Sequence, residues 1–269
     1  MSVQSLYTAA TGMESLQSKL NVIANNMANV NTTGFKSDRA NFEDLFYRKE
    51  ILPGAQDASS NFTPTGTQVG LGVRMQSTQT SFLQGAFQET SQPLDLAIEG
   101  NGFLTVVDPV TNQNLYTRAG NLSVNAAGQI VVGSAQTGRL LNPTVSIPQD
   151  ATNISISSDG RVSFMQPGNP QLQQAGQLNL TIFQNPQGLL KLGENLYVDT
   201  AASGQPIQGT PGSQGIGALR QGFLELSNVE PVRELIDLIT TQRSFEMNSQ
   251  VIEAGDQILQ VITNLARNG

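Results

Sequence analysis

The sequence predicts an α+β protein in which long N- and C-terminal α-helices flank a central all-β domain of short antiparallel strands. Apolar residues recur every seven positions near each end of the chain, as they do along one stripe of a helix. Between about residues 73 and 226, apolar and polar residues alternate instead, with Gly-containing turns between the runs. The two seven-residue repeats also predict that the terminal helices pair as a coiled coil.

The first helix has an apolar stripe made of two interleaved sets with the same period. The residues predicted to pack in this helix are Leu6, Met13, Leu16, Leu20, Ile23 and Met27. Up to Phe35 the only charged residues are Glu14 and Lys19, whereas a helix that faces water normally carries charges on its outer face. An ordinary amphipathic helix at the edge of a domain is one interpretation, and an assembly helix with partners on several sides is the other. The scarcity of charge favours the assembly helix.

Asparagine residues are concentrated at the end of this helix. Asn25, Asn26, Asn29 and Asn31 lie in a stretch that is poor in charge, so their amides are expected to fix the register between packed helices by hydrogen bonding. Gly34 occupies the position expected for a left-handed residue after the helix. We therefore predict that residues 31–36 close the first helix.

The C-terminal helix is predicted to begin at Pro231, which suits the first turn of a helix. Its apolar stripe repeats every seven residues and comprises Leu238, Phe245, Ile252 and Leu259, with Val251, Ile258 and Leu265 beside it. Isolated helices are only marginally stable in water. The terminal helices are thus expected to be poorly ordered until neighbouring subunits bury their stripes.

The central region is predicted to contain several β-hairpins. The turns expected to join them lie at residues 100–102, 127–128 and 158–160. Before this region, residues 53–70 are rich in Pro, Gly, Ser and Thr and have no apolar period. They are either a disordered loop or an arm that becomes ordered against a neighbour.

The composition argues against most kinds of chemistry. The chain has no His and no Cys, which removes the commonest general base, the commonest metal ligand and every disulfide. The net charge of −7 argues against nucleic acid as a partner. We predict no enzymatic activity, cofactor, metal or small-molecule substrate. A glycosidase that uses two carboxylates stays open, since its acids need only meet in the fold.

Six segments resemble motifs of the bacterial flagellar rod and hook proteins. They are residues 24–36, 42–45, 94–103, 116–120, 222–229 and 242–246. The first is the most specific, and its motif residues are Asn25, Asn26, Asn29, Asn31, Gly34 and Phe35. The resemblance spans nearly the whole chain, so this sequence is identified as a member of the rod and hook family.

The resemblance implies a division of the chain. The expected parts are terminal coiled-coil helices at 1–35 and 228–269 as an inner core, connecting segments at 36–75 and 205–227 with an extended rod-type loop at 46–66, and an outer β domain at 76–204. The loop resembles an insertion that rod members carry and most hook members lack. Its residues Pro53, Gly54, Gln56, Pro64 and Gly66 are implied to stiffen the rod.

The implied function is that of a structural subunit of the distal rod, a hollow helical drive shaft that carries torque and serves as an export channel. The implied partners are other copies of the chain, the proximal rod proteins, the hook protein, the surrounding P- and L-ring proteins and the flagellar type III export apparatus. The implied location is the basal body across the periplasm and outer envelope. The start of the chain lacks the features of a cleaved signal peptide, which fits such a route.

Two alternatives are kept. The chain could be another axial protein of the flagellum, either a proximal rod or a hook subunit. It could also be a secreted β-rich protein that binds or cleaves glycans, although the absence of Trp argues against a stacking platform for sugars.

Overall fold

A computed structural model describes residues 3–54, 62, 64–133, 138–213 and 215–268. The chain forms two compact units, each built from segments that are far apart in the sequence. Unit 1 contains residues 1–27, 38–79 and 230–269, and unit 2 contains residues 28–37 and 80–229.

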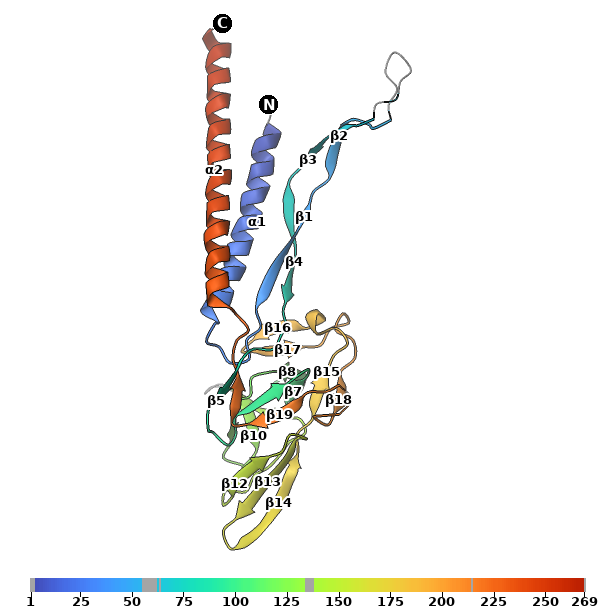
Figure 1. The fold of residues 1–269 in the computed structure, drawn as a ribbon, viewed down its shortest axis with the longest axis vertical. Helices are drawn as coiled ribbons and strands as arrows, with labels where there is room; N and C mark the ends of the chain where they lie inside the picture. The colour runs from blue at the N-terminus through green and yellow to red at the C-terminus, as the bar shows by residue number, and fades with distance from the viewer. Residues whose placement is uncertain (1–2, 55–61, 63, 134–137, 214, 269) are drawn as a thin grey trace. The chain divides into compact units, whose positions relative to one another are not determined.

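Unit 1 contains two long helices that lie side by side, α1 (Val3–Ala28) and α2 (Pro231–Asn268) (Figure 1). The prediction that α2 begins at Pro231 is confirmed. Helix α1 ends at Ala28, earlier than predicted, and the chain continues as a turn in which the N–H of Thr32 bonds to the carbonyl of Asn29. Neither helix is long and apolar enough over its described residues to cross a membrane.

The rest of unit 1 is an arm of paired antiparallel strands (Figure 1). Strand β1 (Asp38–Asp44) pairs with β4 (Val73–Thr80), and beyond them β2 (Tyr47–Ile51) pairs with β3 (Thr67–Gly70). Of residues 53–70, which lack an apolar period, residues 67–70 form β3, and a two-stranded pair has no buried face of its own.

The middle of the arm, where β4 begins, is bonded to α1. The hydroxyl of Ser15 donates to the carbonyl of Val73 over 3.4 Å, and the N–H of Val73 donates to the hydroxyl of Thr11 over 3.5 Å. The arm therefore passes alongside the first helix.

Unit 2 is an all-β structure of short strands. Its strands are β5 (Phe87–Glu89), β6 (Leu96–Glu99), β7 (Phe103–Val107), β8 (Asn114–Thr117), β9 (Leu122–Val124), β10 (Ile130–Gly133), β11 (Gly138–Leu141), β12 (Thr152–Ile156), β13 (Arg161–Gln166), β14 (Asn169–Gln177), β15 (Leu180–Ile182), β16 (Leu190–Gly193), β17 (Leu196–Val198), β18 (Ile207–Gly209), β19 (Ala218–Gln221) and β20 (Phe223–Glu225). A single turn of 3₁₀ helix covers Pro186–Gly188.

These strands form one large sheet and three smaller ones. The large sheet has the order β16-β17-β8-β7-β11-β10-β9, with β15 joining β7 to β18. The others are β12-β13-β14, β6-β19 and β5-β20. All the pairings with a described register are antiparallel, as the alternation of apolar residues predicted.

Two predicted hairpins are confirmed and one is wrong. Strand β9 pairs with β10, and β12 pairs with β13. Strands β6 and β7 do not form the hairpin expected around residues 100–102: β6 pairs with β19, and β7 pairs with β8, β11 and β15. The carbonyl of Asn101 accepts a hydrogen bond from the N–H of Gly217 over 2.7 Å, so a distant segment occupies this turn.

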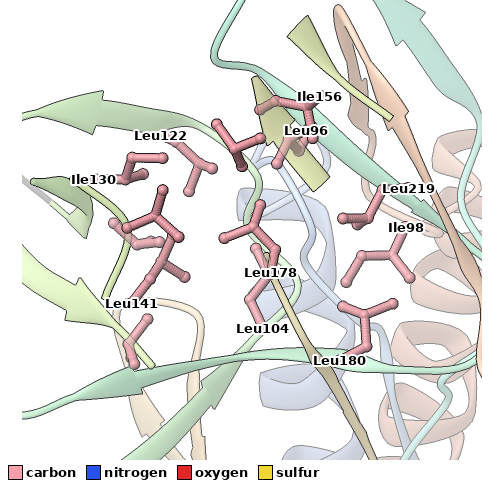
Figure 2. Packing of buried hydrophobic residues seen from close by; sticks show 14 of the residues in the cluster. Leu96, Ile98, Leu104, Leu122, Ile130, Leu141, Ile156, Leu178, Leu180 and Leu219 are labelled. Atoms are coloured by element: carbon pink, nitrogen blue, oxygen red, sulfur yellow. The ribbon is translucent and has the colours of Figure 1, made fainter. Parts of the chain in front are cut away.

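The core of unit 2 draws aliphatic side chains from most of these strands. Figure 2 shows Ile98 and Leu219, from β6 and β19, on the same side of the cluster as Leu180 from β15. A second cluster is aromatic and contains Phe103, Tyr116, Phe183 and Tyr197 with Leu189. The apolar residues of the alternating pattern thus make the core that was expected.

Candidate functional site

The helices of unit 1 contact each other along antiparallel faces. A Cβ atom on Gly255 would lie within 2.4 Å of the Leu6 side chain, and one on Gly12 would lie 3.2 Å from the Asn248 amide. Near the other end, the amide nitrogen of Asn26 donates to Glu234 Oε1 over 3.1 Å. Later residues of α1 contact earlier residues of α2, so the two helices are antiparallel. We call the face along which they touch the seam.

Of the apolar residues predicted for packing, Leu6 lies in the seam, against Gly255. Ile23 is buried, and the other predicted residues of both helices, Leu6, Met13, Leu16, Leu20, Met27, Leu238, Phe245, Ile252 and Leu259, are half-buried. On α2, three further residues alternate with this set at spacings of three and four: Thr241, Asn248 and Gly255. Small and polar residues at these places allow the two backbones to come close.

The side chain of Asn26 connects three elements of unit 1. Its side chain is buried and bonds to both backbone groups of Asp38, donating to the carbonyl over 2.8 Å and accepting from the N–H over 2.9 Å. Its bond to Glu234 reaches α2 at the same time. Burial raises the pKa of Glu234, and the hydrogen bond from Asn26 opposes that rise. One amide therefore joins α1, α2 and the arm.

Replacing Asn26 with Ala is expected to destabilise unit 1 by about 1–3 kcal/mol, because the half-buried backbone of Asp38 and the Glu234 carboxylate lose their hydrogen bonds to the buried amide. Thermal unfolding followed by the helical circular dichroism signal measures this change. The matched control is Asn21→Ala on the exposed side of the same helix, which should stay within about 0.5 kcal/mol of the wild type. Equal effects of the two substitutions would contradict the role given to Asn26.

A second apolar face of α2 lies outside the seam. Side chains on it are about half exposed or more, and Val251 and Ile258, which the sequence placed beside the stripe, belong to it. The exposed apolar residues of α2 are Val232, Leu235, Ile236, Ile239, Met247, Val251, Ile258, Val261 and Ile262. We call this set the outer face of α2. Most of it continues through α2 at helical spacing, and the described part of unit 1 leaves it open to solvent.

The arm also presents apolar side chains to solvent. Phe46 is 89% exposed and Phe62 is 70% exposed. Of the residues predicted to stiffen the rod, Pro53, Gly54 and Pro64 are exposed, and a Cβ on Gly66 would collide with the carbonyl of Ile51 at 2.4 Å. Gln56 lies outside the described residues. Gly66 is thus required for the two sides of the arm to approach.

The motif loop, residues 29–37, follows α1 in the chain, and from residue 28 it belongs to unit 2. Asn29 accepts a hydrogen bond from the hydroxyl of Thr32, and Asn31 is exposed. Gly34 has φ +69° and its N–H donates to the carbonyl of Glu225 over 2.8 Å. A Cβ there would lie 3.0 Å from the backbone of Arg118, so both the backbone angle and the close approach require glycine.

Phe35 and Lys36 are buried in unit 2. The ammonium of Lys191 lies 5.1 Å from the centre of the Phe35 ring and donates to the carbonyl of Lys36 over 2.9 Å. The amide of Asn195 donates to the carbonyl of Thr33 over 3.0 Å. The end of the motif is therefore a docked loop and not part of a helix.

Three charged side chains of unit 2, one of them from this loop, form two ion pairs. The ammonium of Lys36 is 2.7 Å from one carboxylate oxygen of Glu225, and Nε of Arg118 is 3.0 Å from the other. The side chains of Lys36 and Glu225 are 0% exposed, and that of Arg118 is 3% exposed. We call these residues the charge cluster. It holds two cations and one anion.

The surplus cation changes the titration of Lys36. Burial and the charge of Arg118 lower the pKa of the Lys36 ammonium from 10.5 to about 8, and Glu225 offsets only part of this. Folded protein therefore binds fewer protons at this site than unfolded protein between these two pH values. Below pH 8 the free energy of folding includes the full cost of burying the charged Lys36 ammonium. This cost falls as the pH rises from about 8 to 10.5.

Wild-type protein is thus expected to gain stability relative to Lys36→Met as the pH rises from 7 to about 9.5. Urea unfolding of both proteins at the two pH values measures the difference, and the variant serves as the control because it lacks the titrating group. A difference that stays constant or shrinks with pH would contradict the lowered pKa of Lys36.

Comparisons with known proteins find family matches in three stretches of the chain. Residues 6–36 match the family described as "Flagella basal body rod protein", and residues 220–265 match "Flagellar basal body rod FlgEFG protein C-terminal". Residues 97–164 match "Flagellar hook protein FlgE/F/G D1 domain". A flagellar basal-body rod protein FlgG of Caulobacter vibrioides is 46% identical over 264 residues, covering 98% of this chain and 99% of the relative. The chain belongs to the flagellar basal-body rod protein family.

Further relatives come from other bacteria. FlgG of Buchnera aphidicola is 43% identical and covers 98% of this chain and 100% of the relative. FlgG of Bacillus subtilis is 39% identical and covers 98% and 100%. Each match runs along both units, so the family assignment applies to the whole rod protein.

Sequence reasoning did not assign roles to several residues that organise the rod protein. Lys36, Arg118 and Glu225 all lie in motifs that carry the resemblance, yet nothing in their spacing shows that they meet. The signal that could have found them is their charge beside apolar residues. Only 13% of the residues are charged, and each of these three is next to an apolar residue in the sequence. Among the described residues, no group of Asp and Glu side chains is arranged to hold a metal ion.

Proposed function

We propose that this chain is a structural subunit of the flagellar distal rod and that it polymerises into a hollow helical drive shaft. The observation that carries the proposal is the outer face of α2. One long helix has two apolar faces, and α1 packs on only one of them. Monomeric soluble proteins rarely expose an apolar strip of this length, so such a strip marks an interaction site.

Another copy of the chain is the partner that this surface fits. Contacts between unlike patches on identical subunits generate a helical polymer when the rotation does not close. The outer face of α2 would be one patch of such a contact. The terminal segments 1–35 and 228–269 would then form the inner core as coiled coils, and residues 76–204 would form the outer domain, joined by segments 36–75 and 205–227.

The exposed aromatic residues of the arm support a second contact between subunits. Phe46 and Phe62 extend from a two-stranded element that buries little of its own surface. Docked against a neighbour, this arm would restrict bending, which fits the stiffening role proposed for Pro53, Gly54, Gln56, Pro64 and Gly66. The rod would thereby transmit torque from the motor to the hook by repeated non-covalent contacts, without a chemical step.

The proposed partners follow from this place in the flagellum. They are the proximal rod proteins, the hook protein, the P- and L-ring proteins and the flagellar type III export apparatus. The channel inside the polymer would pass later subunits to the growing tip, across the periplasm and outer envelope.

Electron microscopy of basal bodies purified from a strain that lacks the gene tests this function. We expect truncated rods without hooks, and full-length rods when the gene is restored. Restoring the gene without residues 53–66 tests the stiffening segment separately, since rods should then form but bend. Normal rods and hooks in the deletion strain would overturn the proposed function.

A further inference from the structure

We propose that the charge cluster is a clamp that makes two chain segments dock on the β-structure of unit 2 only together. The leading segment, residues 31–37, follows α1 in the sequence. The trailing segment, residues 225–229, begins at the last residue of β20, which pairs with Phe87 of β5, and precedes α2. Both lie in unit 2. The inference concerns folding of the single subunit, so it does not depend on the proposed function.

Glu225 of the trailing segment holds the leading segment twice. Its backbone carbonyl accepts the N–H of Gly34 over 2.8 Å, and its carboxylate accepts the ammonium of Lys36 over 2.7 Å. The same carboxylate accepts the N–H of Gly85 over 2.9 Å and Nε of Arg118 over 3.0 Å. One side chain thus joins both segments to the β-structure.

Asn228 makes the reverse connection. Its amide oxygen accepts the N–H of Ser37 over 2.8 Å, and its own N–H donates to the carbonyl of Phe35 over 3.4 Å. Its amide nitrogen donates to the carbonyls of Ser81 and Leu83 over 2.8 and 3.1 Å. The ammonium of Lys36 also donates to the carbonyl of Leu83, over 2.7 Å. Both segments therefore share the strip at residues 81–85.

The leading segment also has anchors that do not involve the trailing segment. They are the bonds from Lys191 and Asn195 to the carbonyls of Lys36 and Thr33. If docking were independent, these bonds would keep the leading segment in place after the trailing segment had lost its charge. If the clamp operates, these bonds do not hold the leading segment in place by themselves, because Lys36 and Arg118 would then be left buried without an anion.

The charge balance makes the clamp testable. Removing Glu225 leaves Lys36 and Arg118 without an anion, so the folded site must hold two like charges or release the Lys36 proton, whereas removing Lys36 leaves a neutral pair between Arg118 and Glu225. A second substitution that removes the surplus cation should therefore repair part of the damage done by the first. Damage from lost packing alone would instead accumulate.

Hydrogen–deuterium exchange of the full-length subunit tests the inference with Glu225→Gln, Lys36→Met and the double variant. In Glu225→Gln we expect exchange to rise about tenfold or more in residues 31–37 as well as in 225–229. Lys36→Met should change exchange in 225–229 less than Glu225→Gln does, and the double variant should be better protected than Glu225→Gln. Arg161→Gln, which removes an exposed ion pair in the same unit, is the control and should leave both segments protected.

Three results would overturn the clamp. Exchange in Glu225→Gln could rise in 225–229 while residues 31–37 stay protected as in the wild type. The double variant could exchange as fast as Glu225→Gln or faster. If Glu225→Gln fails to fold, the double variant decides: a folded double variant supports the clamp, and an unfolded one overturns it.

Discussion

Glu225→Gln is expected to destabilise unit 2 by about 3–5 kcal/mol, because it removes one partner from a buried charge cluster and leaves two cations without an anion. The substitution keeps the size of the side chain, so lost packing contributes little. Lys36→Met is expected to cost much less, since the remaining pair of Arg118 and Glu225 is neutral and each keeps hydrogen bonds to the backbone.

Urea unfolding followed by tyrosine fluorescence suits this measurement. The chain has no Trp, and Tyr116 and Tyr197 lie in the buried aromatic cluster of unit 2. The control is Arg161→Gln, which removes an ion pair with Asp159 in which both side chains are exposed. Its effect should stay within about 1 kcal/mol. If Lys36→Met costs as much as Glu225→Gln, the surplus-cation account of the cluster is wrong.

Ile258→Lys is expected to block polymerisation while the monomer stays folded. Ile258 belongs to the outer face of α2 and is 51% exposed in the single chain. Burying the exposed half of such a side chain contributes about 1 kcal/mol, and an unpaired charge in its place adds a penalty of about the same size or more. Each 1.4 kcal/mol changes the association constant by a factor of about ten, so the critical concentration for assembly should rise about tenfold or more.

Sedimentation of the purified protein over a range of concentrations measures assembly, and motility of the complemented deletion strain reports its consequence. Gln260→Lys is the matched control, because it places the same charge on an exposed polar position two residues away. It should assemble nearly as well as the wild type. Equal loss of assembly in both variants would indicate a general effect of positive charge, and the outer face would then not be the contact.

The family, the two helices, many strands and the apolar core were all available in the sequence. Periodicity reports which side chains share a face, so it placed Leu238 and Ile252 on one stripe of α2 and the alternating residues on strands. Local chemistry also placed the start of α2 at Pro231 and the turn at Asp159–Gly160. These features depend on neighbours in the chain, and the sequence shows those directly.

Only the tertiary structure decided which segments meet. The strands on either side of residues 100–102 pair elsewhere because a distant glycine, Gly217, bonds into their turn. Val251 and Ile258 turn out to lie on the outer face of α2 since Thr241, Asn248 and Gly255 take the places opposite α1.

The charge cluster shows the same limit most clearly. Lys36, Arg118 and Glu225 are separated by 82 and 107 residues along the chain, and no periodic pattern links such distant positions. Their pairing depends on burial, because a carboxylate without water must find cations wherever the fold brings them. Sequence alone therefore determined what each segment is, and the fold determined which buried charges must be satisfied together.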